Sequence, residues 1–138
     1  MRFNKGFTLI ELIITISVIA ILNISLLLYL PKLLGKLRLK YTLNEIYQNF
    51  NYSRNLAMAI DEDIIITSEE DKLILSTAEK KVKEFAFPSY VNLSMNVSKL
   101  GFKSSGYTKH AGTLTAQVAK EEAKIKLGVG YGIFSKTD

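Results

Sequence analysis

The chain has 138 residues, no cysteine, one histidine and a formal net charge of +5. This length suits one small domain with an added segment rather than two domains. The absence of cysteine excludes a disulfide framework, a thiol nucleophile and a cysteine-ligated metal site. The charge is uneven, because residues 1–60 hold 7 basic and 2 acidic side chains whereas residues 61–138 hold 11 of each. The C-terminal part therefore lacks the basic excess that is typical of a nucleic-acid-binding domain.

An apolar run over residues 7–30 follows a short leader that contains Arg2 and Lys5. At about 1.5 Å per residue, a helix over this run is roughly 36 Å long, enough to cross a hydrocarbon core of about 30 Å. A secretory signal peptide is the alternative, but its apolar part is usually about 7–15 residues long and ends at a small-residue cleavage site. This run is longer and no such site closes it, so we expect a membrane helix.

Glu11 is the one charged residue of the apolar run. A carboxylate inside a membrane-length helix is costly, so by default it is functional and has a partner. A plain membrane anchor does not explain Gly6, Phe7 and Glu11 together.

Residues 6–11, Gly-Phe-Thr-Leu-Ile-Glu, resemble the processing site of type IV pilins and type II secretion pseudopilins. The resemblance implies that a prepilin peptidase cleaves after Gly6 and that the new amine of Phe7 is then methylated. It also implies that Glu11 pairs with the N-terminal amine of a neighbouring subunit during assembly. An ammonium and a carboxylate that are desolvated together offset each other's burial cost, whereas either alone is penalised.

Two signals for the orientation of the span conflict. Four basic residues at positions 32–40 outnumber the two in the leader, so charge alone favours a C-terminal part inside the cell. The motif implies cleavage on the cytoplasmic side, and we give it priority. We therefore expect a single-pass protein of the bacterial inner membrane with its head outside the cytoplasm, and a periplasmic or cell-surface filament after assembly.

Residues 31–60 are predicted to form a second, amphipathic helical segment. Pro31 and Gly35 mark a kink or weak point at its start. Apolar side chains then recur about every three to five residues, which predicts a stripe that a sheet can cover. The predicted stripe consists of Leu33, Leu37, Tyr41, Ile46, Phe50, Ala57 and Ile60.

From Asp61 onward the pattern becomes that of strands separated by turns. Two pairs of strands flank short polar turns and are predicted to form hairpins. Residues 101–112 are rich in glycine and are predicted to be mostly loop. The predicted strands cover residues 64–67, 73–76, 82–87, 91–97, 113–119, 123–129 and 131–134.

These elements predict an α+β protein with the layout of the pilin fold, a long N-terminal helix packed on an antiparallel β-sheet head. The expected organisation is a leader (1–6), a transmembrane and assembly helix (7–30), an amphipathic stalk helix (31–60) and a β-sheet head (61–138). Residues 50–134 also resemble the GspH- and FimT-like minor pseudopilins and small competence minor pilins. That resemblance rests on Ser53-Arg54-Asn55-Leu56-Ala57 before an isoleucine-rich strand, Phe102-x3-Gly106, Gly112-Thr113-Leu114-Thr115, and Gly132-Ile133.

Basic and aromatic residues alternate in the segment that ends at His110. Such a mixture can hold phosphates and stack the bases of single-stranded nucleic acid. The other interpretation is a surface loop whose aromatic side chains cover the edge of the sheet. The candidate DNA contacts are Lys99, Phe102, Lys103, Tyr107 and Lys109.

We expect no enzyme activity, no cofactor and no metal. His110 is the lone histidine, and no nucleophile motif accompanies it, so a Ser-His-Asp triad is not indicated. One histidine without cysteine excludes most zinc sites. Acidic clusters at residues 61–63 and 69–71 flank the first predicted strand, but they lack the spacing of an EF-hand and are interpreted as solvated loops.

The sequence therefore favours a structural function, that of a minor pilin or pseudopilin added to a type IV pilus-like filament. The expected partners are prepilin peptidase, other pilin subunits, the inner-membrane assembly platform and membrane lipid, with DNA as a further candidate. Three machines fit: a competence pilus for DNA uptake, a type II secretion system, and a pilus for adhesion or motility. The alternative is a membrane-tethered receptor whose head binds DNA directly.

Overall fold

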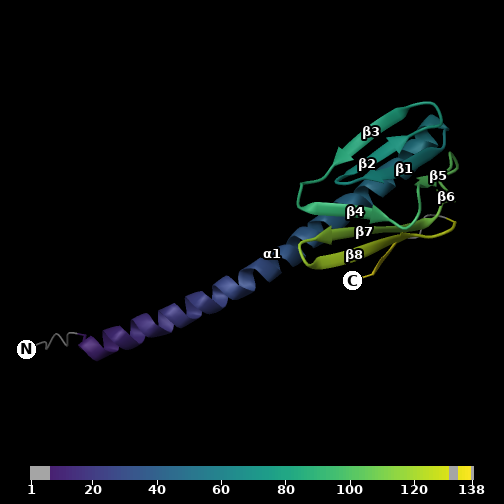
Figure 1. The fold of residues 1–138 in the computed structure, drawn as a ribbon. Coiled ribbons are helices and arrows are strands. Elements are labelled where there is room, and N and C mark those ends of the chain that lie inside the picture. Colours follow the sequence, from purple (N-terminus) through teal and green to yellow (C-terminus); the bar gives the residue numbers. More distant parts are fainter. Residues whose placement is uncertain (1–6, 131–133, 138) are drawn as a thin grey trace, which may run out of the picture. The chain divides into compact units, whose positions relative to one another are not determined.

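The computed structural model describes residues 7–130 and 134–137, and these contain one helix and nine strands (Figure 1). The chain divides into two compact units, Met1–Leu34 and Gly35–Asp138. Helix α1 spans Leu9–Ile60 and contributes to both units. It continues through Pro31, so the predicted weak point lies within unbroken helix.

In the first unit, every side chain of residues 7–34 is exposed. By length and composition, α1 is able to cross a membrane. So large an apolar surface is not stable against water and needs lipid or neighbouring helices to cover it. Most of its few hydroxyl and amide side chains form hydrogen bonds within one turn of the helix.

In the second unit, α1 buries one face against the strands. This face differs from the predicted stripe, because Leu37, Tyr41 and Ile60 are exposed, as is Leu33 just before the unit begins. Apolar residues occupy both sides of the helix near residues 33–41, so the pattern alone did not reveal which side the strands cover. The buried positions are Gly35, Leu39, Thr42, Leu43, Ile46, Asn49, Phe50, Ser53 and Ala57.

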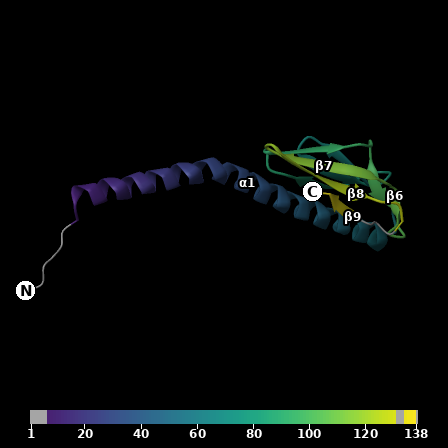
Figure 2. The same cartoon turned by 90° about the horizontal axis from the view of Figure 1, so that it is seen from below.

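The strands form two antiparallel sheets rather than one, in the orders β3-β2-β1-β5-β6 and β4-β7-β8-β9. In Figures 1 and 2 both sheets lie along the same stretch of α1. Their bounds are β1 Ile64–Glu69, β2 Lys72–Ser76, β3 Lys81–Ala86, β4 Val91–Met95, β5 Leu100–Phe102, β6 Thr108–His110, β7 Gly112–Val118, β8 Glu121–Leu127 and β9 Phe134–Thr137.

Both predicted hairpins are confirmed, as β1 pairs with β2 and β7 pairs with β8. The segment at residues 101–112, predicted to be rich in loop, is irregular at residues 103–107 but also contains most of β5 and all of β6, which were not predicted. Each has three residues, too few to show an alternating pattern. Of the predicted last strand, residues 131–133 lie outside the described part of the chain, and β9 begins at Phe134.

A hydrophobic core joins α1 to both sheets. Strands of each sheet alternate between buried and exposed side chains, as β8 does with Ala123, Ile125 and Leu127 turned inward. Phe50 of α1 and Phe102 of β5 are both fully buried in this core. The second unit therefore has a complete interior of its own.

The chain turns from α1 into β1 through a left-handed cap. Asp61 has φ 54°, and Glu62 N donates a hydrogen bond to Ala57 O at 3.3 Å. This is the backbone pattern that commonly ends a helix. It places Asp63 at the start of β1, where its carboxylate reaches a second segment of the head.

Candidate assembly site at the start of the helix

Glu11 lies in the first turn of α1, and its carboxylate bonds back to Thr8. Thr8 N and Thr8 Oγ1 each donate a hydrogen bond to Glu11 Oε2 at 2.8 Å. Glu11 N donates to Thr8 Oγ1 at 3.3 Å. This reciprocal arrangement is a capping box, and it places the carboxylate beside the positive end of the helix dipole.

Thr8 is a residue that the sequence reasoning missed. Its signal was present, since Thr-x-x-Glu before an apolar run is the pattern of a capping box. An ionised carboxylate can accept several hydrogen bonds at once. Glu11 can therefore accept a further donor while the two from Thr8 stay in place.

Four other polar side chains of the apolar run at residues 7–30 bond to the backbone one turn earlier. Ser17 Oγ donates to Ile13 O at 2.8 Å, and Ser25 Oγ donates to Ile21 O at 3.0 Å. Thr15 and Asn23 bond in the same way to Glu11 O and Ile19 O. Such local bonds satisfy polar groups where no water is present, so Glu11 is the residue of the apolar run at residues 7–30 that needs a charged partner.

Four of the five candidate DNA-contact residues are exposed, and Phe102 is the exception. Phe102 is fully buried in β5, so its proposed role in base stacking is wrong. Its side chain is a core residue because β5 pairs with β1 at the centre of the sheet. Lys99, Lys103 and Tyr107 are exposed. Lys109 is exposed as well, and it forms an ion pair within the head.

Lys109 is held by Asp63, with 2.8 Å between Lys109 Nζ and Asp63 Oδ2. Asp63 Oδ1 also accepts a hydrogen bond from Ser104 N at 2.9 Å. These two contacts, the Lys109 bond first, lower the pKa of Asp63. They tie the β5–β6 segment to the start of β1. Nearby, burial and the charges of Lys99 and Lys109 lower the pKa of His110.

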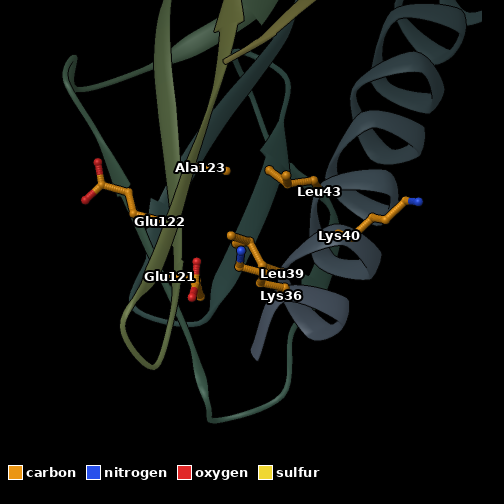
Figure 3. Close-up of a pocket in the computed structure, with 7 residues that line it drawn as sticks. All are labelled: Lys36, Leu39, Lys40, Leu43, Glu121, Glu122 and Ala123. Carbon is orange, nitrogen blue, oxygen red and sulfur yellow. The ribbon is translucent and has the colours of Figure 1, made fainter. Parts of the chain in front are cut away.

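A groove of about 340 Å³ lies between α1 and the start of β8 (Figure 3). Leu39, Leu43 and Ala123 give it an apolar wall. Figure 3 shows the ends of Lys40 and Glu122 pointing away from it, so these groups do not converge on a common point. Within residues 7–130 and 134–137, no group of three or more His, Cys, Asp or Glu side chains could hold a metal ion.

Comparison with known proteins bears on both units. Residues 1–22 match a family model described as the prokaryotic N-terminal methylation motif. A search of curated proteins gives no match. The fold is similar to the solved structure of the minor pseudopilin EpsH from the Type 2 Secretion System of Vibrio cholerae. The TM-score is 0.56 at 13% identity, over 71% of this chain and 94% of that chain. Motif and fold together support the type IV pilin and pseudopilin family.

The predicted fold class is confirmed, since one long N-terminal helix packs against antiparallel sheets as in a pseudopilin. The motif and the apolar helix also fit a pilin anchored in the inner membrane.

Proposed function

We propose that this chain is a minor pseudopilin that enters a filament through its N-terminal segment. Prepilin peptidase cleaves between Gly6 and Phe7, the amine of Phe7 is methylated, and Glu11 binds the N-terminal ammonium of a neighbouring subunit. The observation that carries the proposal is the methylation-motif match over residues 1–22, with Glu11 as the one charged residue of the apolar run.

The capping box gives this proposal a chemical basis. Before assembly, the two donors of Thr8 hold the Glu11 carboxylate in a defined direction at the start of α1. Neutral donors satisfy its oxygens but leave its charge uncompensated in a medium of low dielectric constant. An incoming ammonium supplies the opposite charge, so the pair is more stable in the assembled filament than either group is alone.

The exposed apolar side chains of residues 7–34 support the same sequence of events. Lipid covers them while the subunit is a membrane-held monomer. Helices of other subunits replace that lipid in the filament, where van der Waals packing stabilises the helix contacts. Recruitment then depends on Glu11, because lipid and a helix are similarly apolar.

A substitution of Glu11→Ala tests the role of this carboxylate. We expect the variant to be cleaved as wild type is, shown by the mass of its N-terminal peptide, and to be absent from sheared filaments. Glu79→Ala, in the exposed β2–β3 turn, is the matched control and should enter filaments normally. Normal incorporation of Glu11→Ala would contradict the pairing, and an uncleaved wild-type chain would contradict the processing.

Among the three machines, we propose protein secretion as the first to test, because the similar solved structure comes from a secretion system. A strain that lacks the gene should lose export of specific proteins, and complementation should restore it. Loss of labelled-DNA uptake with normal export would instead favour a competence pilus. The DNA-receptor alternative is weakened by the burial of Phe102 and the pairing of Lys109 with Asp63.

A further inference from the structure

The side of α1 that faces away from the strands carries a regular row of uncharged residues. Its members are separated alternately by three and four positions, the spacing of the a and d positions in helices that pack side by side. All are exposed except the half-buried Asn51. The row consists of Leu37, Tyr41, Asn44, Gln48, Asn51 and Asn55.

The row lies on a different side of α1 from the core residues of the same helix. Leu39, Ile46 and Phe50 are buried by the sheets, and none of them occupies a position of the row. At 3.6 residues per turn, a three-four spacing keeps its members on one face. The strands therefore leave this face of the second unit uncovered.

The composition of this face is unusual for a helix that meets water. Glu45 and Arg54 are the only charged residues between positions 41 and 60. The solvent side of a surface helix is normally charged, whereas the centre of a protein interface is depleted of charge and enriched in tyrosine. The residues of the row themselves carry no charge that would attract anionic lipid or nucleic acid.

The amides at the centre of the row make it complementary to itself. Each asparagine or glutamine side chain carries both hydrogen-bond donors and an acceptor. A face with amides at successive a and d positions is therefore matched by an identical face. Buried amides at such positions select register and partner at a cost in stability, which suits a reversible contact.

Two charged residues beside the row fit the same arrangement. Lys40 and Glu45 occupy the g and e positions next to it, five residues apart. In a parallel pair of helices, a g residue of one helix faces the e residue of the following heptad in the other. Lys40 of each copy then lies opposite Glu45 of its neighbour. Both residues are exposed, and Figure 3 shows Lys40 extending away from the strands.

We propose that this face of α1 binds a second copy of this chain, as a parallel helix pair with Asn44 and Gln48 at its centre. The pair rests on the proposed function, because a shared membrane orientation makes the two helices parallel. The contact is distinct from that of Glu11, since it uses the second unit and no N-terminal amine. It defines a dimer that forms in the membrane before the subunits enter a filament.

Cross-linking in the full-length chain tests the pair directly, because the natural sequence has no cysteine. A Gln48→Cys variant, made at its native expression level and treated in membranes with a short bismaleimide, should form a covalent dimer. Gln117→Cys, exposed on β7, is the matched control and should give at least fivefold less dimer. When two differently tagged forms of the Gln48→Cys chain are made together, both tags should be found in one cross-linked dimer, which shows that the partner is a second copy.

Charge exchange tests the register in the same assay. Lys40→Glu should lower the yield of the Gln48→Cys dimer about fivefold, the effect of replacing two exposed ion pairs with like charges. Glu45→Lys should lower it similarly, and the double exchange Lys40→Glu/Glu45→Lys should restore it. Restoration distinguishes a direct contact from damage to the helix.

The outcomes separate this proposal from the proposed function. A chain that is cleaved and enters filaments, yet gives no more dimer from Gln48→Cys than from Gln117→Cys, overturns the pair alone. Cross-links only to a different pilin subunit overturn it as well. An uncleaved chain contradicts the proposed function whatever the dimer yield.

Discussion

The two units of this chain bury their surface in different ways. Residues 7–34 expose every side chain, whereas the second unit has a buried core that draws on α1 and both sheets. The first unit therefore depends on lipid or on other subunits for its environment. The second unit supplies most of its own. We expect substitutions in the first unit to change assembly and substitutions in the second to change stability.

Their polar groups differ in the same way. In the first unit, polar side chains bond within one turn of the helix, as Thr8 does with Glu11 and Ser17 with Ile13. In the second unit, polar contacts join segments that are distant in the sequence, such as Asp63 with Lys109. Local bonds survive transfer from lipid to filament, while long-range bonds require the intact head.

Among the tests of this comparison, the largest effect is expected on the free energy of unfolding when a core aromatic side chain is removed. Phe50→Ala removes a fully buried ring from α1 and should lower the free energy of unfolding by about 3–5 kcal/mol. Leu22→Ala, in the exposed first unit, is the control and should leave head stability unchanged. Denaturant unfolding of the full chain in detergent, followed by tyrosine near-ultraviolet circular dichroism, measures both. Equal losses would contradict the independence of the two units.

Sequence patterns predicted the parts of the fold that depend on residues close together in the chain. The β1–β2 and β7–β8 hairpins were predictable because each has alternating residues and a polar turn. The pairing of β5 with β1 was not, because it depends on a long-range approach. A Cβ atom on Gly101 would lie 2.4 Å from Ile64 O, so glycine there permits the strands to meet. In sequence the same glycine suggested a loop.

The candidate site was predictable to a similar extent. The functional role of Glu11 was predictable because it is the one charge in an apolar run. A carboxylate in a membrane helix is costly, so its presence indicates a function. Thr8 was missed because its role arises from hydrogen bonds to Glu11 rather than from charge. Phe102 was assigned to the surface because basic residues lie near it in the sequence. Its burial was not predictable, because a strand of three residues is too short to show the alternation of buried and exposed side chains.

A smaller effect is expected from Thr8, whose hydroxyl positions Glu11. Thr8→Val keeps the shape but removes one of the two donors to Glu11 Oε2 and a helix cap worth about 1 kcal/mol. We expect normal cleavage and a severalfold lower amount in sheared filaments, a weaker defect than that of Glu11→Ala. Thr8→Ser retains the hydroxyl and should restore incorporation. Wild-type incorporation of Thr8→Val would show that the cap does not position the carboxylate.

The smallest expected effect is a pH dependence confined to the head. Glu84 of β3 lies 2.8 Å from Lys72 Nζ and also bonds Lys81, and these contacts, that of Lys72 first, lower its pKa from 4.5 to about 2. Because the pKa is lowered in the folded state, the stabilisation is complete above pH 4.5 and is lost as the pH falls toward 2.

The measurement is the thermal midpoint of the full chain in detergent between pH 2 and pH 6. The difference between wild type and Glu84→Gln should be largest at pH 6 and vanish near pH 2, and it should stay small because all three side chains are partly exposed. Lys72→Met leaves only the Lys81 contact and should move the loss to higher pH. A difference that grows as the pH falls would reverse the sign of the linkage and contradict the ion pair.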